Sequence, residues 1–377
     1  MIDQMADTIP LIEPVVGDDE LGNIESVLES GYMTQGPYAD EFEDGFADRV
    51  GADHAITVTS CTTGMELALD ALGIGPGDEV PLPDFTHPAT ANAVVRMGAE
   101  PVLVDVDRDT YNVDTDALSD AVTDETGALL PVSWGGQPLP TDVVNDIAAA
   151  HGVPVLEDAA CSSGAAYDGQ PVGSQFDVSV FSFHPRKVLT TGEGGMITTD
   201  DDDLEREIRS VKNFGTDQRE GEIGFVRADA TNFRFSDILA AVGVAQLDRL
   251  DEIVERRREI AHRYTDLLED VPGVTPPAEP APAHHNFQSY CIYVEAGDEH
   301  TRDDLIDALA EQDIESQIGT YALHQTDAFA DAKRVGDLET SRALHHNLLT
   351  LPVAHSMTDR DQERVVETLA AALESAT

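Results

Sequence analysis

A lysine that directly follows an apolar strand is the residue in this sequence best suited to covalent chemistry. Lys187 is one of only three lysines in 377 residues, beside Lys212 and Lys333, in a chain that otherwise uses arginine for positive charge. A lysine amine can lose its proton and form a Schiff base with a carbonyl, whereas a guanidinium stays charged. Because an ordinary lysine has a pKa of about 10.4, we expect the site to lower the pKa of Lys187 through burial or neighbouring charge.

Two further stretches carry polar residues at the end of an apolar strand. Residues 153–160 are predicted to form a buried strand, in which four apolar residues are followed by the two acids Glu157 and Asp158. Residues 55–60 are rich in β-branched residues and lead through Cys61-Thr62-Thr63-Gly64 to an amphipathic helix at 65–72. A strand, a hydroxyl-rich turn and a helix start form an anion site, because free N–H groups and the helix dipole converge there. Hydroxyls also cap helices that bind nothing.

These residues resemble a known family. Ser182, His184 and Lys187, the turn Gly192-Glu193-Gly194-Gly195 and the motif Glu157–Ala160 are similar to motifs of the DegT/DnrJ/EryC1/StrS family of sugar aminotransferases, which use pyridoxal phosphate (PLP). The resemblance extends from about residue 10 to residue 373. It implies fold type I (aspartate aminotransferase-like), an α/β fold with a mainly parallel central sheet in a large domain and a smaller α+β C-terminal domain. We predict a large PLP-binding domain, including the N-terminal segment, over residues 1–250 and a small domain over 251–377.

The resemblance also implies roles for individual residues. Lys187 would hold PLP as a Schiff base and then shuttle a proton as general base and acid. Asp158 would pair with the pyridine nitrogen and keep it protonated, whereas for Glu157 we expect only a turn-capping acid. The other residues matched to cofactor contacts are Thr62 and Thr63 at the phosphate, Ser182, His87 over the ring, Cys161 where relatives have Gln or His, and Asn232, which would reach the PLP of the neighbouring subunit. Cys61 departs from the small residue usual in the family.

The substrate side is less specified by the motifs. The resemblance places Thr34, in the loop 30–37, and His184, Tyr321 and His324 near the substrate. The loop could equally be a plain connector, Tyr321 and His324 ordinary packing residues, His87 a structural histidine and Asn232 a generic turn residue. Each of these alternatives remains open at the level of sequence.

The implied activity is transfer of an amino group to a sugar. The donor would be an amino acid, with glutamate as the family implies, and the acceptor a nucleotide-linked keto-sugar aminated at C4 or C3, for amino-sugar and surface glycan biosynthesis. A PLP-dependent sugar dehydratase or deoxygenase is one alternative, but there the family replaces the lysine by histidine. A non-catalytic regulator is another, and it predicts a helix-turn-helix or a basic face, neither of which is apparent.

The composition of the chain indicates which kinds of partner and which cellular compartment to expect. Asp and Glu number 73 against 22 Lys and Arg, a net charge of −51, which argues against nucleic-acid binding because that requires a basic face. The run Arg256–Arg258 is interpreted as a solvated helix face. No stretch is apolar enough for a signal peptide or a membrane helix, and the three distant cysteines indicate neither a disulfide framework nor a metal site. We expect a homodimer with shared active sites in the cytoplasm of a salt-accumulating halophile, where salt screens the charge.

The elements that must position these residues alternate along the chain. Strands separated by helical stretches predict βαβ units and a mainly parallel sheet. Strands are expected at 55–60, 101–107, 127–132, 153–160, 177–183, 196–199 and 290–294, and helices at 19–28, 38–50, 65–72, 202–210, 240–247, 247–268, 302–312 and 359–373.

Overall fold

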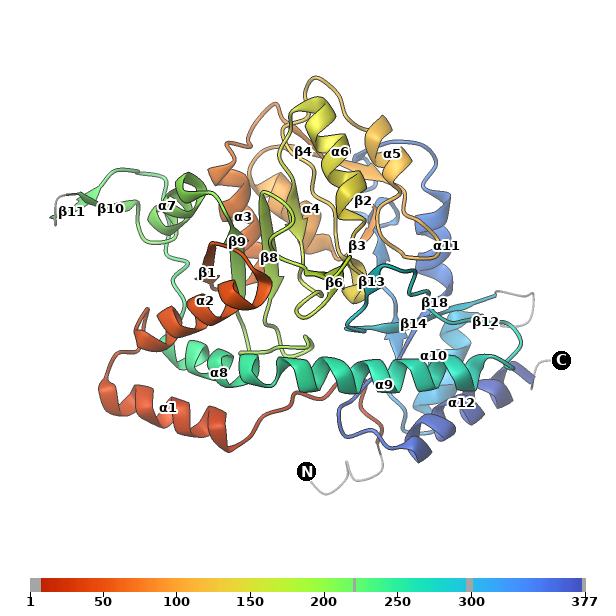
Figure 1. The fold of residues 1–377 in the computed structure, drawn as a ribbon. Coiled ribbons are helices and arrows are strands. Elements are labelled where there is room, and N and C mark those ends of the chain that lie inside the picture. Colours follow the sequence, from red (N-terminus) through yellow and green to blue (C-terminus); the bar gives the residue numbers. More distant parts are fainter. Residues whose placement is uncertain (1–7, 220–221, 296–300, 375–377) are drawn as a thin grey trace.

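The central sheet brings together strands from distant parts of the chain. The structure, a computed structural model, describes residues 8–219, 222–295 and 301–374 (Figure 1). The start of the predicted large domain, residues 1–7, and the end of the predicted small domain, residues 375–377, lie outside the described residues. Four strands lie in the order β1, β9, β8, β5. β8 pairs parallel with β5, whereas β9 is antiparallel to both of its neighbours. Their bounds are His54–Val58 for β1, Gly195–Thr199 for β9, Val178–Ser182 for β8 and Leu156–Asp158 for β5.

The segment 126–132 continues this sheet beyond β5. Its Leu129 N–H donates to the Pro154 carbonyl and its Leu130 N–H to the Pro81 carbonyl, each at 2.9 Å. It thereby joins β5 to β2 (Glu79–Pro83), which pairs parallel with β4 (Glu100–Val104), and β4 pairs parallel with the short strand β17 (Lys333–Arg334). Among the described strands of this sheet only β9 runs antiparallel, so the predicted mainly parallel sheet is confirmed.

Helices cover the strands and explain their apolar sequences. Every residue of β8 is buried, because a parallel sheet covered on both faces needs apolar side chains on both. Helix α3 (Cys61–Ala71) packs closely on β8 and β9, and a Cβ added at Gly64 would lie 2.7 Å from Val180 Cγ1. The other helices of this part are α1 (Asp18–Ser30), α2 (Pro37–Val50), α4 (Pro88–Arg96), α5 (Thr115–Asp120), α6 (Thr141–His151), α7 (Asp202–Val211) and α8 (Asp237–Asp248).

A second apolar core lies in the C-terminal part of the chain. The long helix α9 (Leu250–Leu268) runs from α8 toward it along the base of the molecule in Figure 1. An antiparallel sheet in the order β12, β14, β18, β15 forms this core with α9, α10 and α12. The bounds are Val274–Thr275, Tyr290–Val294, Leu348–Leu351 and Gln317–Ile318 for the strands, and Arg302–Ala310 and Asp359–Glu374 for α10 and α12.

Several short elements connect the two parts. β16 (Tyr321–Ala322) pairs with β3 (Phe85–Thr86), and β13 (Ala283–His284) pairs with β6 (Ala166–Tyr167), which in turn pairs with β7 (Gln170–Pro171). Helix α11 (Glu339–Asn347) follows β17, and the hairpin of β10 (Thr216–Arg219) and β11 (Glu222–Phe225) follows α7. The division at residue 250 stays a prediction.

The run Arg256–Arg258 on α9 is not a solvated face. Arg257 is only 3% exposed, and its Nη1 donates to the carbonyls of Phe287 and Gln288 at 3.3 Å each. Burial lowers the pKa of this guanidinium to about 10. The interpretation from sequence was wrong for Arg257 because α9 turns this residue toward the loop that precedes β14. In the described part of the chain no helix is long and apolar enough to cross a membrane.

Candidate active site

Lys187 lies in the turn that follows β8. Its N–H donates to the His184 carbonyl at 2.8 Å, and its Nζ donates to Cys161 Sγ at 3.1 Å. Solvent reaches part of the side chain, yet protein atoms surround the ammonium group, so desolvation lowers its pKa. The neighbouring Cys161, Asp158 and Cys61 raise it and outweigh that effect, so the pKa of Lys187 is raised. The expected lowering was wrong for this state, because the amine faces groups that stabilise its positive charge.

The two other lysines have different environments. Lys212, at the end of α7, is 1% exposed, and its Nζ donates to the Thr57 carbonyl at 2.9 Å and lies 3.6 Å from Glu43 Oε1. Burial lowers the pKa of Lys212 to about 8. Lys333 is exposed and pairs with Glu79. Of the three lysines, only Lys187 lies among the residues predicted to hold the cofactor.

Asp158 ends β5 and is oriented by a contact that the sequence did not indicate. It is 5% exposed. Its Oδ2 accepts a hydrogen bond from Thr90 Oγ1 at 2.7 Å, and its Oδ1 accepts one from the Ala160 N–H at 3.1 Å. Thr90 belongs to α4, so a helix from another βα unit holds the carboxylate of β5 in place.

Glu157 does not cap a turn, contrary to the expectation from sequence. Neighbouring residues of a strand point to opposite faces, and Glu157 accepts hydrogen bonds from Ser133 Oγ at 2.5 Å and Ser179 Oγ at 2.7 Å. Burial raises the pKa of this carboxyl group to about 7. Glu157 therefore links strands inside the sheet and stands apart from Lys187.

The N-terminus of α3 presents free donors. The first intrahelical bond runs from the Gly64 N–H to the Ser60 carbonyl at 3.0 Å, so the N–H groups of Cys61 and Thr62 precede it. Thr63 is committed to the cap, because its Oγ1 accepts from the Ser60 N–H at 3.1 Å and donates to the Ser60 carbonyl at 2.9 Å. Among the described residues the Thr62 hydroxyl has no such partner. These groups suit a phosphate.

Lys187, Asp158 and the N-terminus of α3 make up what we call the inner group, and His87 and Ser182 are the next two residues predicted to contact the cofactor. His87 caps α4, and its Nδ1 accepts from the Ala89 N–H at 3.2 Å. Partial burial and the charge of Lys187 lower the pKa of His87, while Asp158 opposes them. Ser182 is buried at the end of β8 and accepts from the His184 N–H at 3.4 Å. Charges of both Lys187 and Asp158 act on the His87 ring, and its role over the cofactor stays a prediction.

The residues predicted for the substrate and the neighbouring subunit lie outside this inner group. Tyr321 is exposed, and its strand pairs it with Thr86, next to His87. His324 is held by buried Asp84, with Nδ1 2.7 Å from Asp84 Oδ2. The remaining three are exposed: Thr34 in a bridge with Ser236, Asn232 accepting from Arg234 Nε at 2.9 Å, and His184 accepting from the Arg186 N–H at 3.2 Å.

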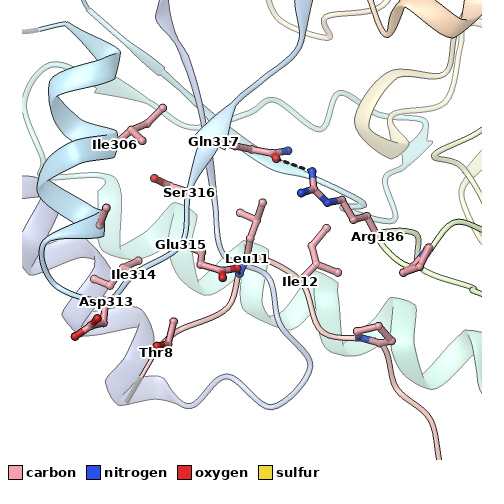
Figure 2. A pocket seen from close by; sticks show the side chains of 13 residues that line it. Thr8, Leu11, Ile12, Arg186, Ile306, Asp313, Ile314, Glu315, Ser316 and Gln317 are labelled. Carbon is pink, nitrogen blue, oxygen red and sulfur yellow. Dashed lines mark hydrogen bonds between the residues drawn. The ribbon is translucent and has the colours of Figure 1, made fainter. Parts of the chain in front are cut away.

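A groove of about 570 Å³ borders the Lys187 turn on another side. It lies between the N-terminal segment and residues 306–317, with Pro185 and Arg186 at its edge (Figure 2). Arg186 Nη1 donates to Gln317 Oε1 at 3.0 Å. The lining of the groove includes the aliphatic side chains of Leu11, Ile12, Ile306 and Ile314. Charged side chains of Arg186, Asp313 and Glu315 line the same groove, so it combines apolar and charged surface.

The inner group fits a cofactor with three features. Lys187 supplies an amine for an aldehyde, Asp158 a carboxylate for a ring nitrogen, and the start of α3 free donors for a phosphate. PLP has all three features. In the part of the chain that the structure describes, no group of three or more His, Cys, Asp or Glu side chains could hold a metal ion.

Comparisons with known proteins point to the same chemistry. The model of the DegT/DnrJ/EryC1/StrS aminotransferase family matches residues 14–370. The spore coat polysaccharide biosynthesis protein SpsC of Bacillus subtilis (strain 168) is 36% identical over 97% of each chain. Two solved structures are each 31% identical: DesV of S. venezuelae in complex with a ketimine intermediate, with a TM-score of 0.89 over 97% of this chain and 98% of that one, and DesI in the presence of its TDP-sugar product, with a TM-score of 0.90 over 98% of this chain and 94% of that one.

Proposed function

Because the chain belongs to the DegT/DnrJ/EryC1/StrS aminotransferase family, we propose that it transfers an amino group from glutamate to the ketone of a nucleotide-linked sugar. It is a PLP-dependent sugar aminotransferase of fold type I, an enzyme class that serves glycan biosynthesis. The observation that carries the proposal is the position of Lys187, whose Nζ lies at the carboxyl end of the sheet beside Cys161 and near Asp158.

The proposed roles follow from the contacts of the side chains. Bound PLP supplies a ring that withdraws electrons from the substrate carbon. Lys187 would hold the cofactor covalently and, once free, would move a proton with its Nζ. Asp158, oriented by Thr90, would pair with the ring nitrogen and keep it protonated. The N–H groups of Cys61 and Thr62 and the Thr62 hydroxyl would bind the phosphate.

A nucleotide-linked acceptor is supported by DesI, which was solved in the presence of its TDP-sugar product. The name of SpsC, a spore coat polysaccharide biosynthesis protein, supports a role in glycan biosynthesis. We propose amination at C4 or C3 of the sugar. The dehydratase alternative is disfavoured because this chain has a lysine at position 187, where the dehydratases of the family have a histidine.

We also propose a homodimer with shared active sites in the cytoplasm of a salt-accumulating cell. The hairpin β10–β11 extends away from the body of the molecule (Figure 1) and carries exposed Ile223 and Phe225, which are 66% and 75% exposed. Exposed apolar side chains on a protruding element are typical of a protein interface. Asn232, on the segment that follows this hairpin, would complete the PLP site of the partner.

A two-step spectral assay tests the proposed reaction. Purified enzyme loaded with PLP should show a visible absorption band that glutamate bleaches and that a nucleotide-linked keto-sugar restores. Aspartate and alanine serve as alternative donors. A band that persists with every amino acid would refute the aminotransferase proposal, and a band that glutamate bleaches but no keto-sugar restores would refute the proposed acceptor.

A further inference from the structure

A buried glutamine holds the backbone on both sides of Lys187. Gln288 lies just before β14, 102 residues from Arg186, and is 4% exposed. Its Oε1 accepts from the Val188 N–H at 2.8 Å, and its Nε2 donates to the Arg186 carbonyl at 2.5 Å. The two peptide groups that flank Lys187 therefore bond to one side-chain amide. Only one orientation of the amide satisfies both, because the N–H needs an acceptor and the carbonyl a donor.

We propose that Gln288 is a positioning residue for Lys187. Its amide fixes the peptide groups on either side of the lysine, and thereby the point from which the side chain extends toward Cys161 and Asp158. This inference rests on the proposed function of Lys187. The loop before β14, which lies outside the sequence motifs around Lys187, thereby gains a role in the active site.

The same loop fixes the other side of the Lys187–Cys161 contact. Asn286 is fully buried, and its Nδ2 donates to the carbonyls of Cys161 and Ser163 at 2.8 and 2.9 Å. Its Oδ1 accepts from the backbone N–H of Gln288 at 2.8 Å, so the Asn286 side chain also holds the backbone from which Gln288 extends. The loop 285–288 thus bonds both segments whose side chains meet at 3.1 Å between Nζ and Sγ.

The loop 285–288 is itself anchored from two directions. Buried Arg257 of α9 donates to the carbonyls of Phe287 and Gln288. On the other side, the Asn286 N–H donates to the Gly136 carbonyl at 3.3 Å. Gly136 has a φ of 96°, and an added Cβ would lie 1.7 Å from Asn286 Oδ1. A glycine is required there by both backbone conformation and space. The amides of this loop therefore have a fixed frame from which to hold the lysine.

Removing the amide should displace Lys187 more than it unfolds the protein. Without Gln288 the Val188 N–H and the Arg186 carbonyl lose buried partners, and the turn must shift to satisfy them. A displacement of about 1 Å at a catalytic group can lower a rate on the order of 100-fold. Binding of the amino donor depends on other contacts and should change far less.

The test compares Gln288→Met and Gln288→Glu with Gln362→Glu. Gln362 is an equally buried glutamine on α12, whose Nε2 donates to the Ile260 carbonyl at 2.8 Å, remote in sequence from the Lys187 turn. In the PLP-loaded enzyme both Gln288 variants should lower kcat on the order of 100-fold with KM for the donor near that of the wild type. Gln362→Glu should leave kcat near the wild-type value.

A second readout needs no cofactor. Amide hydrogen exchange at Val188, in the PLP-free protein, should accelerate in Gln288→Met, which removes the acceptor, and stay protected in Gln288→Glu, which keeps it and loses only the donor to Arg186. If Gln288→Met fails to fold, as judged by circular dichroism, the isosteric Gln288→Glu carries the kinetic test. Gln288 variants whose kcat matches that of Gln362→Glu would overturn the proposal. An inactive wild-type enzyme would instead refute the proposed function, and exchange at Val188 would still decide whether the amide holds the turn.

Discussion

At the scale of single residues, Cys161 is one of the neighbours that favour the charged form of the Lys187 amine before the cofactor binds. The Nζ of Lys187 donates to Cys161 Sγ at 3.1 Å, a contact that stabilises the positive charge of the lysine. Here Cys161, Asp158 and Cys61 together outweigh the effect of burial on Lys187. The lysine is therefore held as a cation near a carboxylate, and it must release its proton before it can bond to an aldehyde.

Replacing Cys161 should make the Lys187 amine more reactive at moderate pH. Cys161 raises the pKa of Lys187, so Cys161→Ser lowers that pKa and increases the neutral fraction at any pH below it. The pH profile of Lys187 acylation in the PLP-free protein should move toward lower pH. Exposed Lys333 provides the internal reference in the same peptide map. An unchanged profile would mean that the thiol does not influence the amine.

The sequence located Lys187 and Asp158 because each follows an apolar strand at a recognisable motif. It did not indicate Thr90, Asn286 or Gln288, since an isolated polar residue has no local pattern that shows which distant backbone group it will bond. The direction of the Lys187 pKa was also missed, because it depends on Cys61 and Cys161 approaching the amine from other segments. Contacts between distant segments decide these features, and local periodicity does not encode them.

At the scale of elements, the start of α3 depends on a close approach by β9. A Cβ added at Gly195 would lie 2.7 Å from the Cys61 nitrogen and 2.7 Å from the Ser60 carbonyl carbon. Gly195, the second glycine of the pair in the turn after Lys187, thus lets strand β9 approach the helix terminus closely. This packing places the free N–H groups of α3 beside the carboxyl end of β8, where Lys187 follows.

Two neighbouring threonines of α3 should have separable effects. Thr62→Val removes a hydroxyl available to the phosphate and should raise the Kd for PLP on the order of tenfold, with little change in unfolding. Thr63→Val removes a hydroxyl bonded to Ser60 and should lower the free energy of unfolding by about 1 kcal/mol. PLP titration and chemical denaturation of the PLP-free proteins measure the two quantities. Equal losses of PLP affinity in both variants would show that Thr63 also binds the phosphate.

At the scale of the whole molecule, the predicted strands and helices recur with bounds shifted by a few residues, because their apolar periodicity was strong, except that 127–132 forms only isolated bridges to β5 and its neighbours. Helices α1 and α2 and strand β14 are examples. The two-residue strands that join the N-terminal and C-terminal parts, such as β13 with β6, were not predicted, because so short a run has no periodicity. Arg257 was misassigned for a different reason, since a charged residue on an amphipathic helix gives no sign of the distant carbonyls that it will bond.

The net charge of −51 should make the enzyme dependent on salt. Lowering salt from about 1 M to about 0.1 M lengthens the Debye length from about 3 Å to about 10 Å, so the acidic groups repel one another more strongly. We expect the melting temperature and the activity to fall together on dialysis. Titration with both NaCl and KCl checks the effect, and a melting temperature that stays constant across this range would contradict the halophile proposal.

The shared active site should show as complementation between two inactive variants. Lys187→Ala and Asn232→Ala, unfolded and refolded together, should form hybrids in which one site has both wild-type residues and the other has neither. Random pairing restores about a quarter of all sites in a two-fold dimer. The assay at limiting PLP makes loss of the Asn232 contact most visible. Activity no higher than the mean of the two separate variants would indicate a site built within one chain.

The central claim, that Lys187 is the residue that bonds to the cofactor, is tested most directly by borohydride reduction of the PLP-loaded enzyme. Reduction makes the bond between lysine and cofactor permanent, and peptide mapping then identifies the labelled residue. We predict a single label on Lys187 and none in Lys187→Arg, which keeps the charge but has no amine that can lose its proton. A label on Lys212 or Lys333, or equal labelling of Lys187→Arg, would contradict the assignment.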